Sequence, residues 1–433
     1  MTRSSVRQNP ARLLRSVLPA VATVLSVVSA LLLGGATPAA ALTKPVVNGP
    51  VFNDPLGTAA QRKAIFTQLV RLIDATPTGA QIRGSMHEFA DQEVANALIA
   101  AHGRGVDVRL ILDDSTYVGP DGAEFANPAY RSLRAVLGTS TAARSWVVVC
   151  DDRFEDADGV DDVQRGCLAV APPQPAYNHN KFFLFSRIGP FDDGTSYSRV
   201  VFQTSSNLSD WYKVESFNDA VTFTDSTVYN AYASYHEQLR QGRTLARGNN
   251  NAYFSTPTGS TYRGYFFPRG DASYNNPATD TVVNVLNEVS CAYTGADGLR
   301  HQTDIRIVTH SFFGSRRQVA DKLAQLRGRG CWIDIVYADS DSVITSRLNA
   351  AGIQHRGCRI PNGPGIDVRP HNKQILLDGY YNGDLTPRVY TGSANLTGSS
   401  LRSADEAIVR ISSASYHARY LSEFYRIRAA CGG

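Results

Sequence analysis

Two histidine–lysine pairs have the residue types and spacing best suited to chemistry. His179 and Lys181 lie two residues apart, and His371 and Lys373 repeat this spacing. Side chains two residues apart on a β-strand point to the same face, so each pair presents an imidazole beside an ammonium. One such pair would be a weak signal, because a lone histidine is often only a packed or surface side chain. The second copy carries the inference.

A serine and an asparagine follow each pair, again two residues apart. These are Ser205 with Asn207, and Ser393 with Asn395. If the two segments pack about a pseudo-twofold axis, all these side chains form one cationic pocket suited to a phosphodiester. One imidazole can attack phosphorus while the other protonates the leaving oxygen. The lysines and asparagines can hold the non-bridging oxygens, on which charge grows in the transition state.

The two motifs belong to an internal duplication. Residues 102–113 match residues 327–338, and each copy predicts a strand, an amphipathic helix, a glycine and a second strand. The first strands are predicted over 81–86 and 304–309, and the helices over 92–101 and 317–326. Later blocks align 218–221 with 405–408, and 234–236 with 415–417. The chain is therefore predicted to be α/β, with two similar units.

The N-terminus has the pattern of a secretory signal peptide over residues 1–41. Its arginines precede an apolar run over 16–33, and small residues follow at Ala39-Ala40-Ala41. An uncleaved membrane anchor, which needs about 20 apolar residues, is the alternative. We expect a first half over 42–245, a linker over 246–279 and a second half over 280–433. The linker is rich in Gly, Asn, Ser, Thr and Pro, which predicts a long connecting loop.

The net charge has a different meaning once the signal peptide is set apart. The whole chain has 43 Lys and Arg against 39 Asp and Glu, with 43% hydrophobic residues, which excludes wholesale disorder. Removal of residues 1–41 removes four arginines and no acidic residue, and leaves 39 basic against 39 acidic residues. A formally neutral mature chain disfavours a stable nucleic-acid partner.

The six cysteines are consistent with export. An even number in an exported chain indicates up to three disulfides, and fifteen pairings are possible. We favour Cys150 with Cys167, which would close one short acidic loop. The acidic run 151–162 could hold calcium, but its glycine is not where a calcium loop needs it, so a solvated loop is favoured. We expect no cofactor.

The second copy of the motif resembles a known family. It reads His371-Asn372-Lys373-Gln374-Ile375-Leu376-Leu377-Asp378, followed by Gly392-Ser393-Ala394-Asn395. This resembles the H-x-K-(x)4-D…G-S-x-x-N motif region of the phospholipase D superfamily. The first copy departs from the motif, with Ser186 in place of the aspartate and Thr204 in place of the glycine. The resemblance implies two α-β-α sandwich halves with one active site at their pseudo-twofold interface.

The resemblance also implies a role for each site residue. His179 and His371 would be nucleophile and general acid, in that order, with a covalent phosphohistidine intermediate and no metal. The other implied roles are phosphate holders at Lys181, Lys373, Asn207 and Asn395, assisting hydroxyls at Ser205 and Ser393, a carboxylate against each histidine at Asp219 and Glu406, and a structural aspartate at Asp378. Ser186 puts the support of the first motif in doubt, and the two histidines could exchange roles.

The substrate is not settled by the resemblance, because the family includes phospholipases, phospholipid synthases and nucleases. We expect a secreted, monomeric phospholipase D that cleaves the distal phosphodiester of glycerophospholipids at a membrane or micelle surface, with transphosphatidylation as an accompanying reaction. Export, neutral charge and aromatic residues in predicted loops favour this reading; the rings are Tyr262, Tyr265, Phe266, Phe267, Trp211, Tyr212, Tyr380 and Tyr381.

Two alternative functions remain open. The aromatic rings could instead fill the seam between the halves, or stack on single-stranded bases. A secreted, metal-independent nuclease of the same superfamily is therefore the second reading. A non-catalytic lipid- or envelope-binding protein is the third.

Overall fold

The computed structural model describes residues 43–117, 127–150, 165–171, 175–245, 247–259 and 261–432. The predicted signal peptide and the acidic run 151–162 lie outside these residues. In the part of the chain that is described, no helix is both long and apolar enough to cross a membrane.

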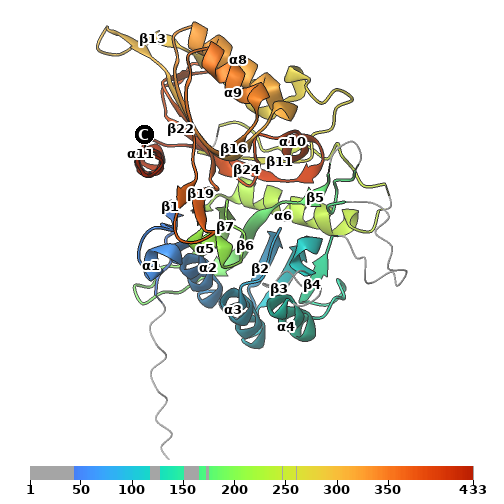
Figure 1. The fold of residues 1–433 in the computed structure, drawn as a ribbon. Coiled ribbons are helices and arrows are strands. Elements are labelled where there is room, and N and C mark those ends of the chain that lie inside the picture. The colour runs from blue at the N-terminus through green and yellow to red at the C-terminus, as the bar shows by residue number, and fades with distance from the viewer. Residues whose placement is uncertain are drawn as a thin grey trace, which may run out of the picture. The chain divides into compact units, whose positions relative to one another are not determined.

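Two large mixed sheets organise the chain (Figure 1). The first has seven strands in the order β1-β9-β7-β6-β2-β3-β4. Their bounds are β1 Gly49–Phe52, β2 Gln81–Met86, β3 Asp107–Leu112, β4 Trp146–Val149, β6 Lys181–Ile188, β7 Tyr197–Thr204 and β9 Asp219–Thr224. The second has eight strands in the order β10-β11-β24-β22-β20-β15-β16-β17. Their bounds are β10 Phe254–Ser255, β11 Tyr262–Phe266, β15 Asp304–Phe312, β16 Trp332–Ser340, β17 Gln354–Gly357, β20 Lys373–Asp378, β22 Arg388–Gly392 and β24 Ala407–Ser412.

The two strand orders confirm the internal duplication. Beyond the extra β10, each strand of the first sheet has a counterpart at the same place in the second. The pairing directions agree as well, since β2 is parallel to β3 and antiparallel to β6, and β15 is parallel to β16 and antiparallel to β20. The aligned glycines explain one turn that the two copies share: Gly105 and Gly330 both have positive φ, which glycine adopts without strain.

The helices lie on both sides of each sheet. The outer face of the first sheet packs against α2 (Ala64–Asp74), α3 (Gln92–Gly103) and α4 (Pro128–Leu137), and that of the second against α7 (Thr281–Asn287), α8 (Arg317–Gly328) and α9 (Ser342–Ala350). Between the sheets lie α6 (Ser226–Gly242) and α11 (Ala414–Ala430), in a core to which both halves contribute. Short helices are α1 (Ala59–Arg62), α5 (Trp211–Val214) and α10 (Gly398–Arg402). The predicted helices 92–101 and 317–326 are α3 and α8.

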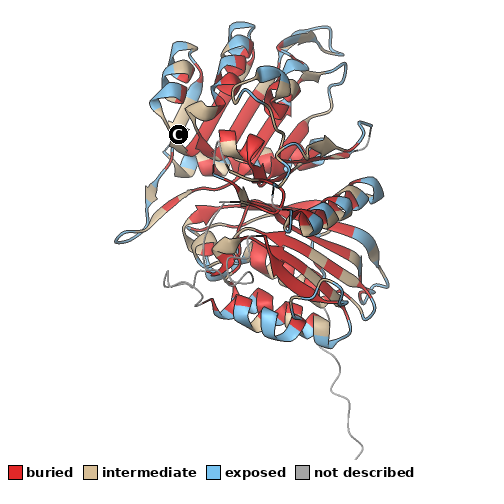
Figure 2. Cartoon of the chain, turned by 90° about the vertical axis from the view of Figure 1, so that its right-hand side faces the viewer, coloured by how far each residue is buried: buried red, intermediate tan, exposed pale blue. Residues whose placement is uncertain are grey.

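The segment predicted as a long connecting loop contains two strands. β10 and β11 both lie within 246–279, and β11 pairs antiparallel with β24 along its length. The composition was misleading because strand residues alternate there with the glycines and polar residues typical of loops. The strands of both large sheets are mostly buried (Figure 2). The aromatic rings of β11 and its end are buried as well, since Tyr262, Tyr265, Phe266 and Phe267 are between 0% and 8% exposed. These four rings therefore fill the protein interior, and the expectation of membrane-facing rings is wrong for them.

Two short parallel pairings join the halves. β5 (Tyr177–Asn178) of the first half pairs with β23 (Ala404–Asp405) of the second, and β19 (Asp367–Pro370) of the second pairs with β8 (Ser216–Phe217) of the first. The other short strands are β12 Val289–Ser290, β13 Ala292–Thr294, β14 Arg300–Gln302, β18 Ile360–Pro361 and β21 Tyr380–Tyr381. Because of these pairings and the shared core, residues 42–433 form one unit.

Three disulfides link elements within the halves. Cys150 pairs with Cys167, as predicted. Cys291 pairs with Cys331 and Cys358 with Cys431, both in the second half.

A buried ion pair ties α7 to the start of α8. Arg316 Nε and Nη2 each donate to the Asp280 carboxylate at 2.8 Å, and both side chains are at most 1% exposed. Gln318 Nε2 donates to the same carboxylate at 3.0 Å. Burial opposes the charged carboxylate, but the pairing with Arg316 holds the pKa of Asp280 below its usual value.

We predict that Asp280→Asn destabilises the fold by about 3–5 kcal/mol, because it leaves the Arg316 charge buried and unpaired. Urea unfolding followed by circular dichroism measures the loss. The matched control is Asp321→Asn, which breaks the exposed pair with Arg347 and is expected to shift the midpoint little. Equal midpoints for the two variants would contradict the prediction.

Candidate active site

The seam between the halves positions both motif histidines. His179 follows β5 directly, and its backbone N donates to Asp405 O of the other half at 2.9 Å. His371 follows β19 directly, and its backbone N donates to Phe217 O at 2.8 Å. The two histidines are 7% and 5% exposed. Each imidazole is thus held at the end of a strand that pairs with the opposite half.

Each imidazole also has a side-chain partner across the seam. His179 Nδ1 lies 2.9 Å from Glu406 Oε1, and His371 Nδ1 lies 2.9 Å from Asn218 Oδ1. The amide of Asn218 is oriented because its Nδ2 donates to Ser216 O and Ser216 Oγ. A carboxylate and an amide oxygen are both acceptors, so each favours the tautomer that carries the proton on Nδ1 and the lone pair on Nε2.

The structure shifts the expected alignment of Asp219 with Glu406, the two residues expected to face the histidines, by one position. Ser205 N donates to Asp219 O, and the equivalent Ser393 N donates to Ala407 O. Asp219 is therefore the counterpart of Ala407, and Asn218 is the counterpart of Glu406. The chain pairs one histidine with a carboxylate and the other with an uncharged amide.

Asp219 does not take the place expected from the family pattern. Its carboxylate accepts from Thr391 Oγ1 at 2.5 Å, Tyr420 OH at 2.9 Å and Asn372 Nδ2 at 3.3 Å. It is completely buried, and burial raises its pKa. Asp219 thus joins β9 to β22 and α11 of the other half, one residue beyond the amide that faces His371.

The two lysines lie beside the histidines, as the spacing predicted. Lys181 Nζ donates to His179 O at 2.9 Å, and Lys373 Nζ donates to His371 O at 2.6 Å. Lys373 Nζ is also 2.9 Å from both ring nitrogens of His371. Burial lowers the pKa of Lys181 to about 7, and lowers that of Lys373 well below its usual value.

The remaining charges of the pocket are also shifted by burial. Burial, with the neighbouring lysines, lowers the pKa of His179 and His371 well below the usual value, so both imidazoles are neutral at pH 7. Burial raises the pKa of Glu406 to about 7, against the opposing effect of Lys181. Neutral imidazoles lie beside two lysines that an anion would hold in the ammonium form, so the site is suited to an anion such as a phosphodiester.

Asn207 and Asn395 offer buried polar atoms. The side-chain oxygen of each is buried and has no hydrogen-bond partner among the described residues. Their loops are held close to the strand ends, because Leu208 forms a parallel bridge with Phe89 and Leu396 with the end of β15. The fold therefore leaves the side-chain oxygens of two equivalent amides without a hydrogen-bond partner among the described residues, which is unusual for buried polar atoms.

The other predicted residues have structural contacts. Ser205 Oγ accepts from Asp219 N and donates to Asn218 Oδ1, and Ser393 Oγ accepts from Ala407 N. These hydroxyls thus brace the residues that support the histidines. Asp378 is exposed at the end of β20 away from Lys373. Its counterpart Ser186 accepts from Gln81 N at 2.8 Å, so the first motif retains a hydrogen bond to the neighbouring strand.

Two further histidines adjoin the motif histidines, and the sequence reasoning missed them. His87 follows β2 and its ring centroid is 5.0 Å from that of His179; His310 lies in β15 at 4.9 Å from His371. His87 Nδ1 is 3.2 Å from Asn178 O, and His310 Nδ1 is 3.2 Å from Pro370 O, the carbonyls just before each motif histidine. The signal was available, since each is the residue directly after a matched predicted strand.

Aromatic rings contact both motif histidines. The ring of Tyr177 is 5.4 Å from that of His179. Tyr212 and Trp211 lie 5.0 and 6.0 Å from the ring of His371. These half-buried rings shield the imidazoles from water on one side of each.

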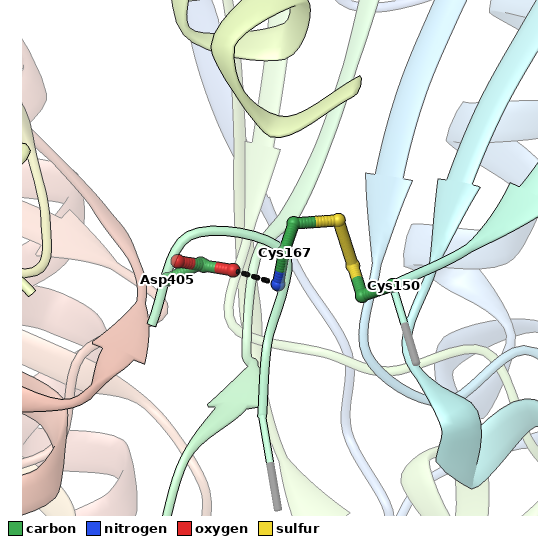
Figure 3. Close-up of side chains that lie close together, drawn as sticks. All are labelled: Cys150, Cys167 and Asp405. Carbon is green, nitrogen blue, oxygen red and sulfur yellow. Dashed lines mark hydrogen bonds between the residues drawn. A yellow bond between two sulfur atoms is a disulfide. The ribbon is translucent and has the colours of Figure 1, made fainter. Parts of the chain in front are cut away.

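One group of side chains at the seam has the composition of a metal site. Cys150, Cys167 and Asp405 lie together (Figure 3), but the two sulfur atoms form a disulfide and are not available as thiolate ligands. The carboxylate of Asp405 accepts from the backbone N of Cys167 at 2.6 Å and from those of Leu168 and Ala169 at 3.1 and 3.0 Å. The cluster therefore anchors a first-half loop to β23.

We predict that Asn218→Asp raises the pKa of His371, because a carboxylate at Nδ1 stabilises the imidazolium. Titration of the imidazole protons by NMR measures the shift, expected to be upward by about one unit or more. The matched control is Ser216→Ala, which removes a hydroxyl from Asn218 Nδ2 without adding charge. An unchanged titration of His371 in the Asn218→Asp variant would show that the side chain at position 218 does not set its protonation.

Comparisons with known proteins follow the same duplication. The family described as "Cardiolipin synthase, PLD-like domain" matches residues 69–240 and 299–428, more than half of the chain. No curated protein matches the sequence. Among solved structures, phosphatidylserine synthase of Haemophilus influenzae is 14% identical with a TM-score of 0.53, and the match covers 88% of this chain and 85% of that one. This likeness shows the fold.

Two other solved structures give lower scores. Polyphosphate kinase of Porphyromonas gingivalis is 12% identical with a TM-score of 0.48; the match covers 87% of this chain and 49% of that one, so this chain spans about half of the kinase. The phospholipase D family member Nuc of Salmonella typhimurium is 20% identical with a TM-score of 0.26, over 36% of this chain and 91% of Nuc. With both of its halves matched by the family and its strand order duplicated, the chain belongs to the phospholipase D superfamily.

Proposed function

We propose that this protein is a secreted phospholipase D that hydrolyses the distal phosphodiester of glycerophospholipids, with transphosphatidylation as an accompanying reaction. The observation that carries the phosphodiesterase part is the pair of buried imidazoles, each with Nδ1 occupied across the seam and a lysine beside it. Superfamily membership supports phosphodiester or phosphoryl-transfer chemistry. The lipid part rests on the formally neutral mature chain, the predicted signal peptide and the rings beside the histidines.

In the proposed first step, His179 Nε2 attacks phosphorus and the bond to the head-group oxygen breaks. His371, which takes up a proton at Nε2 when the anionic substrate binds, donates this proton to the leaving oxygen, so the head group departs as a free alcohol and His371 becomes neutral. In the second step, His371 removes a proton from water, whose oxygen displaces His179 from phosphorus. An alcohol in place of water gives transphosphatidylation by the same route.

The unequal partners support this division of roles. Glu406 accepts the Nδ1 proton of His179, which raises the electron density at Nε2 and stabilises the cationic phosphohistidine. Asn218 also orients His371, but it carries no negative charge that would stabilise the imidazolium. A protonated His371 therefore releases its proton more readily than a histidine paired with a carboxylate. His371 is thus suited to the general acid, and it needs only transient protonation in the substrate complex.

The cationic and amide groups are suited to holding the phosphate. Lys181 and Lys373 each lie beside one histidine and face a buried site, where their charge is weakly screened. We assign the non-bridging oxygens to these ammonium groups and to Asn207 and Asn395. Bound substrate raises the pKa of both lysines, because its negative charge stabilises the ammonium form.

Export is part of the proposal. Three disulfides are compatible with an oxidising compartment outside the cytoplasm. We therefore expect a mature protein that begins after residue 41.

A nuclease is the second candidate, and one contact favours it. The guanidinium of Arg369 lies 5.7 Å from the ring centroid of Trp211, next to His371. A cation stacked on an indole is suited to a nucleic-acid backbone with an adjacent base. The neutral balance of the mature chain weighs against this reading.

We predict that the purified mature protein releases choline from phosphatidylcholine vesicles in EDTA and does not cleave single-stranded DNA in the same buffer. His179→Ala and His371→Ala should each lower the rate by about 10²–10⁴-fold, because nucleophile and proton transfer both depend on imidazoles. His301→Ala, in the β13–β14 hairpin, is the matched control and should retain the rate. DNA cleavage without choline release would overturn the lipid assignment, and full activity of either motif variant would overturn the shared site.

We predict that kcat/KM is bell-shaped, with both limbs near neutrality. It falls as pH rises through about 7 because Lys181, with a pKa of about 7, loses the charge that holds the phosphate. It falls on the acidic side because Glu406, also with a pKa of about 7, becomes protonated and no longer accepts from His179. A plateau of kcat/KM that extends from about pH 6 to about pH 9 would contradict these assignments.

A separate experiment identifies the nucleophile: the reaction is quenched with acid at the pH optimum, and the labelled phosphohistidine is then mapped.

A further inference from the structure

A second polar cleft, apart from the histidine–lysine site, lies between α7 and the strands β11, β24 and β22. Its volume is about 810 Å³, and its lining shares no residue with that site. Four arginines and two carboxylates line it, among hydroxyl, amide and tyrosine side chains: Arg263, Arg269, Arg388, Arg410, Glu288 and Asp384. The cleft therefore has an excess of positive charge, in a mature chain whose total charge is balanced.

Tyrosine rings hold three of the guanidinium groups. Arg388 lies 4.2 Å from the ring centroid of Tyr381, and Arg263 lies 4.9 Å from that of Tyr265. Arg269 is 4.6 Å from the ring of Tyr253. Stacking restricts these long side chains without using their N–H donors. Part of the donors already bond to neighbouring groups: Arg388 to Thr386 O and Asp384, Arg263 to Thr256 O and Ser255 Oγ, and Arg269 to Thr281 Oγ1. Preorganised guanidinium forks are suited to oxyanions.

The strand register places like charges next to one another. Arg263 on β11 is directly opposite Arg410 on β24. Arg388 on β22 is the diagonal neighbour of Arg410, because Arg388 pairs with Ser412. Like charges directly opposite on neighbouring strands destabilise a sheet. Arg388 and Arg410 are only 5% and 7% exposed, which reduces the solvent that could screen them, and Arg388 Nε is buried without a partner among the described residues.

The duplicated first half provides an internal comparison. Thr204 pairs with Ala220 as Gly392 pairs with Ile408, so Thr222 is the counterpart of Arg410 and Val200 that of Arg388. The partner of Thr222 on the edge strand is Gly49, the counterpart of Arg263. The same sheet face thus has no charge at these positions in the first half. The arginines are not a requirement of the fold.

The helix over this face explains why the second half has a cleft. In the first half α2 has 11 residues, and its Gln68 donates to Thr222 Oγ1 at 3.0 Å, so the helix covers the strand. The counterpart α7 has only seven residues. Beside the shorter helix, a cleft lies over the outer ends of β22 and β24, and the arginines line it.

We propose that this cleft is a binding site for a phosphate ester that carries at least two negative charges. Its volume is within the range of small-ligand sites, about 300–1,000 Å³, and exceeds the need of a lone ion. Guanidinium groups on three adjacent strands are spaced to contact several oxygens of one ligand, and bound anion relieves the repulsion between them. A soluble diphosphate and a phosphomonoester lipid head group share this chemistry.

The test uses the mature protein with His371→Ala, so that vesicle lipids are not turned over, and measures binding directly. The probes are inorganic pyrophosphate by calorimetry, and phosphatidylcholine vesicles with or without phosphatidic acid by flotation. Arg263→Gln and Arg410→Thr, the latter restoring the first-half residue, should each weaken binding about tenfold or more, the loss of one charge-assisted contact. Arg347→Gln, in an exposed ion pair, is the matched control and should bind as the parent does.

The outcomes separate the two sources and separate this site from the proposed function. Arginine-dependent binding of pyrophosphate alone assigns a soluble ligand, and arginine-dependent flotation with phosphatidic acid alone assigns a lipid. Arg410→Thr should remain folded without ligand and should lose the rise in unfolding temperature that pyrophosphate causes. If it does not fold, Arg263→Gln decides. Binding of neither probe, or equal binding by parent and arginine variants, would overturn the proposal whatever the activity at His179.

Discussion

The backbone pairing across the seam is the constraint on which the candidate site depends. Each motif histidine directly follows a short strand that pairs with the opposite half, and its own N–H bonds to a carbonyl there. The residue that accepts from each Nδ1 comes from the same partner segment, one position further on. A shift of one half against the other would therefore move a histidine and the support of the other histidine together. Neither half holds a complete site alone.

Burial at this seam sets the electrostatics. Lys181 is completely buried among apolar strands, so its charge is costly without an anion, and its pKa falls to about 7. The same desolvation keeps His179 and His371 neutral. A phosphodiester compensates the ammonium groups and gains an environment with little water to compete for its oxygens. A bound phosphodiester therefore favours the ammonium form of both lysines at this seam.

The duplication distinguishes what the fold needs from what a site needs. Where both copies agree, as in the histidine–lysine pairs and in His87 with His310, the pseudo-twofold axis brings equal groups together. Where they differ, the change is local: Glu406 faces one histidine and Asn218 the other, and arginines replace Thr222 and Val200 on one sheet face. The scaffold is unchanged by these differences, so they are positions at which the halves have taken separate roles.

The sequence alone determined the two α/β copies and the histidine–lysine pairs, because spacing of two on a strand and matched blocks are local properties. For the cysteines it favoured one of fifteen pairings, Cys150 with Cys167, which the structure confirms. It did not determine the partner of His371: aligning two short polar runs cannot resolve a shift of one residue, and only hydrogen bonds across the seam place Asn218 there and Asp219 beyond it. The burial of Phe266, in a segment with loop composition, also depends on pairing with a strand more than a hundred residues away. Contacts between distant segments decide which polar groups meet, and only the tertiary structure specifies them.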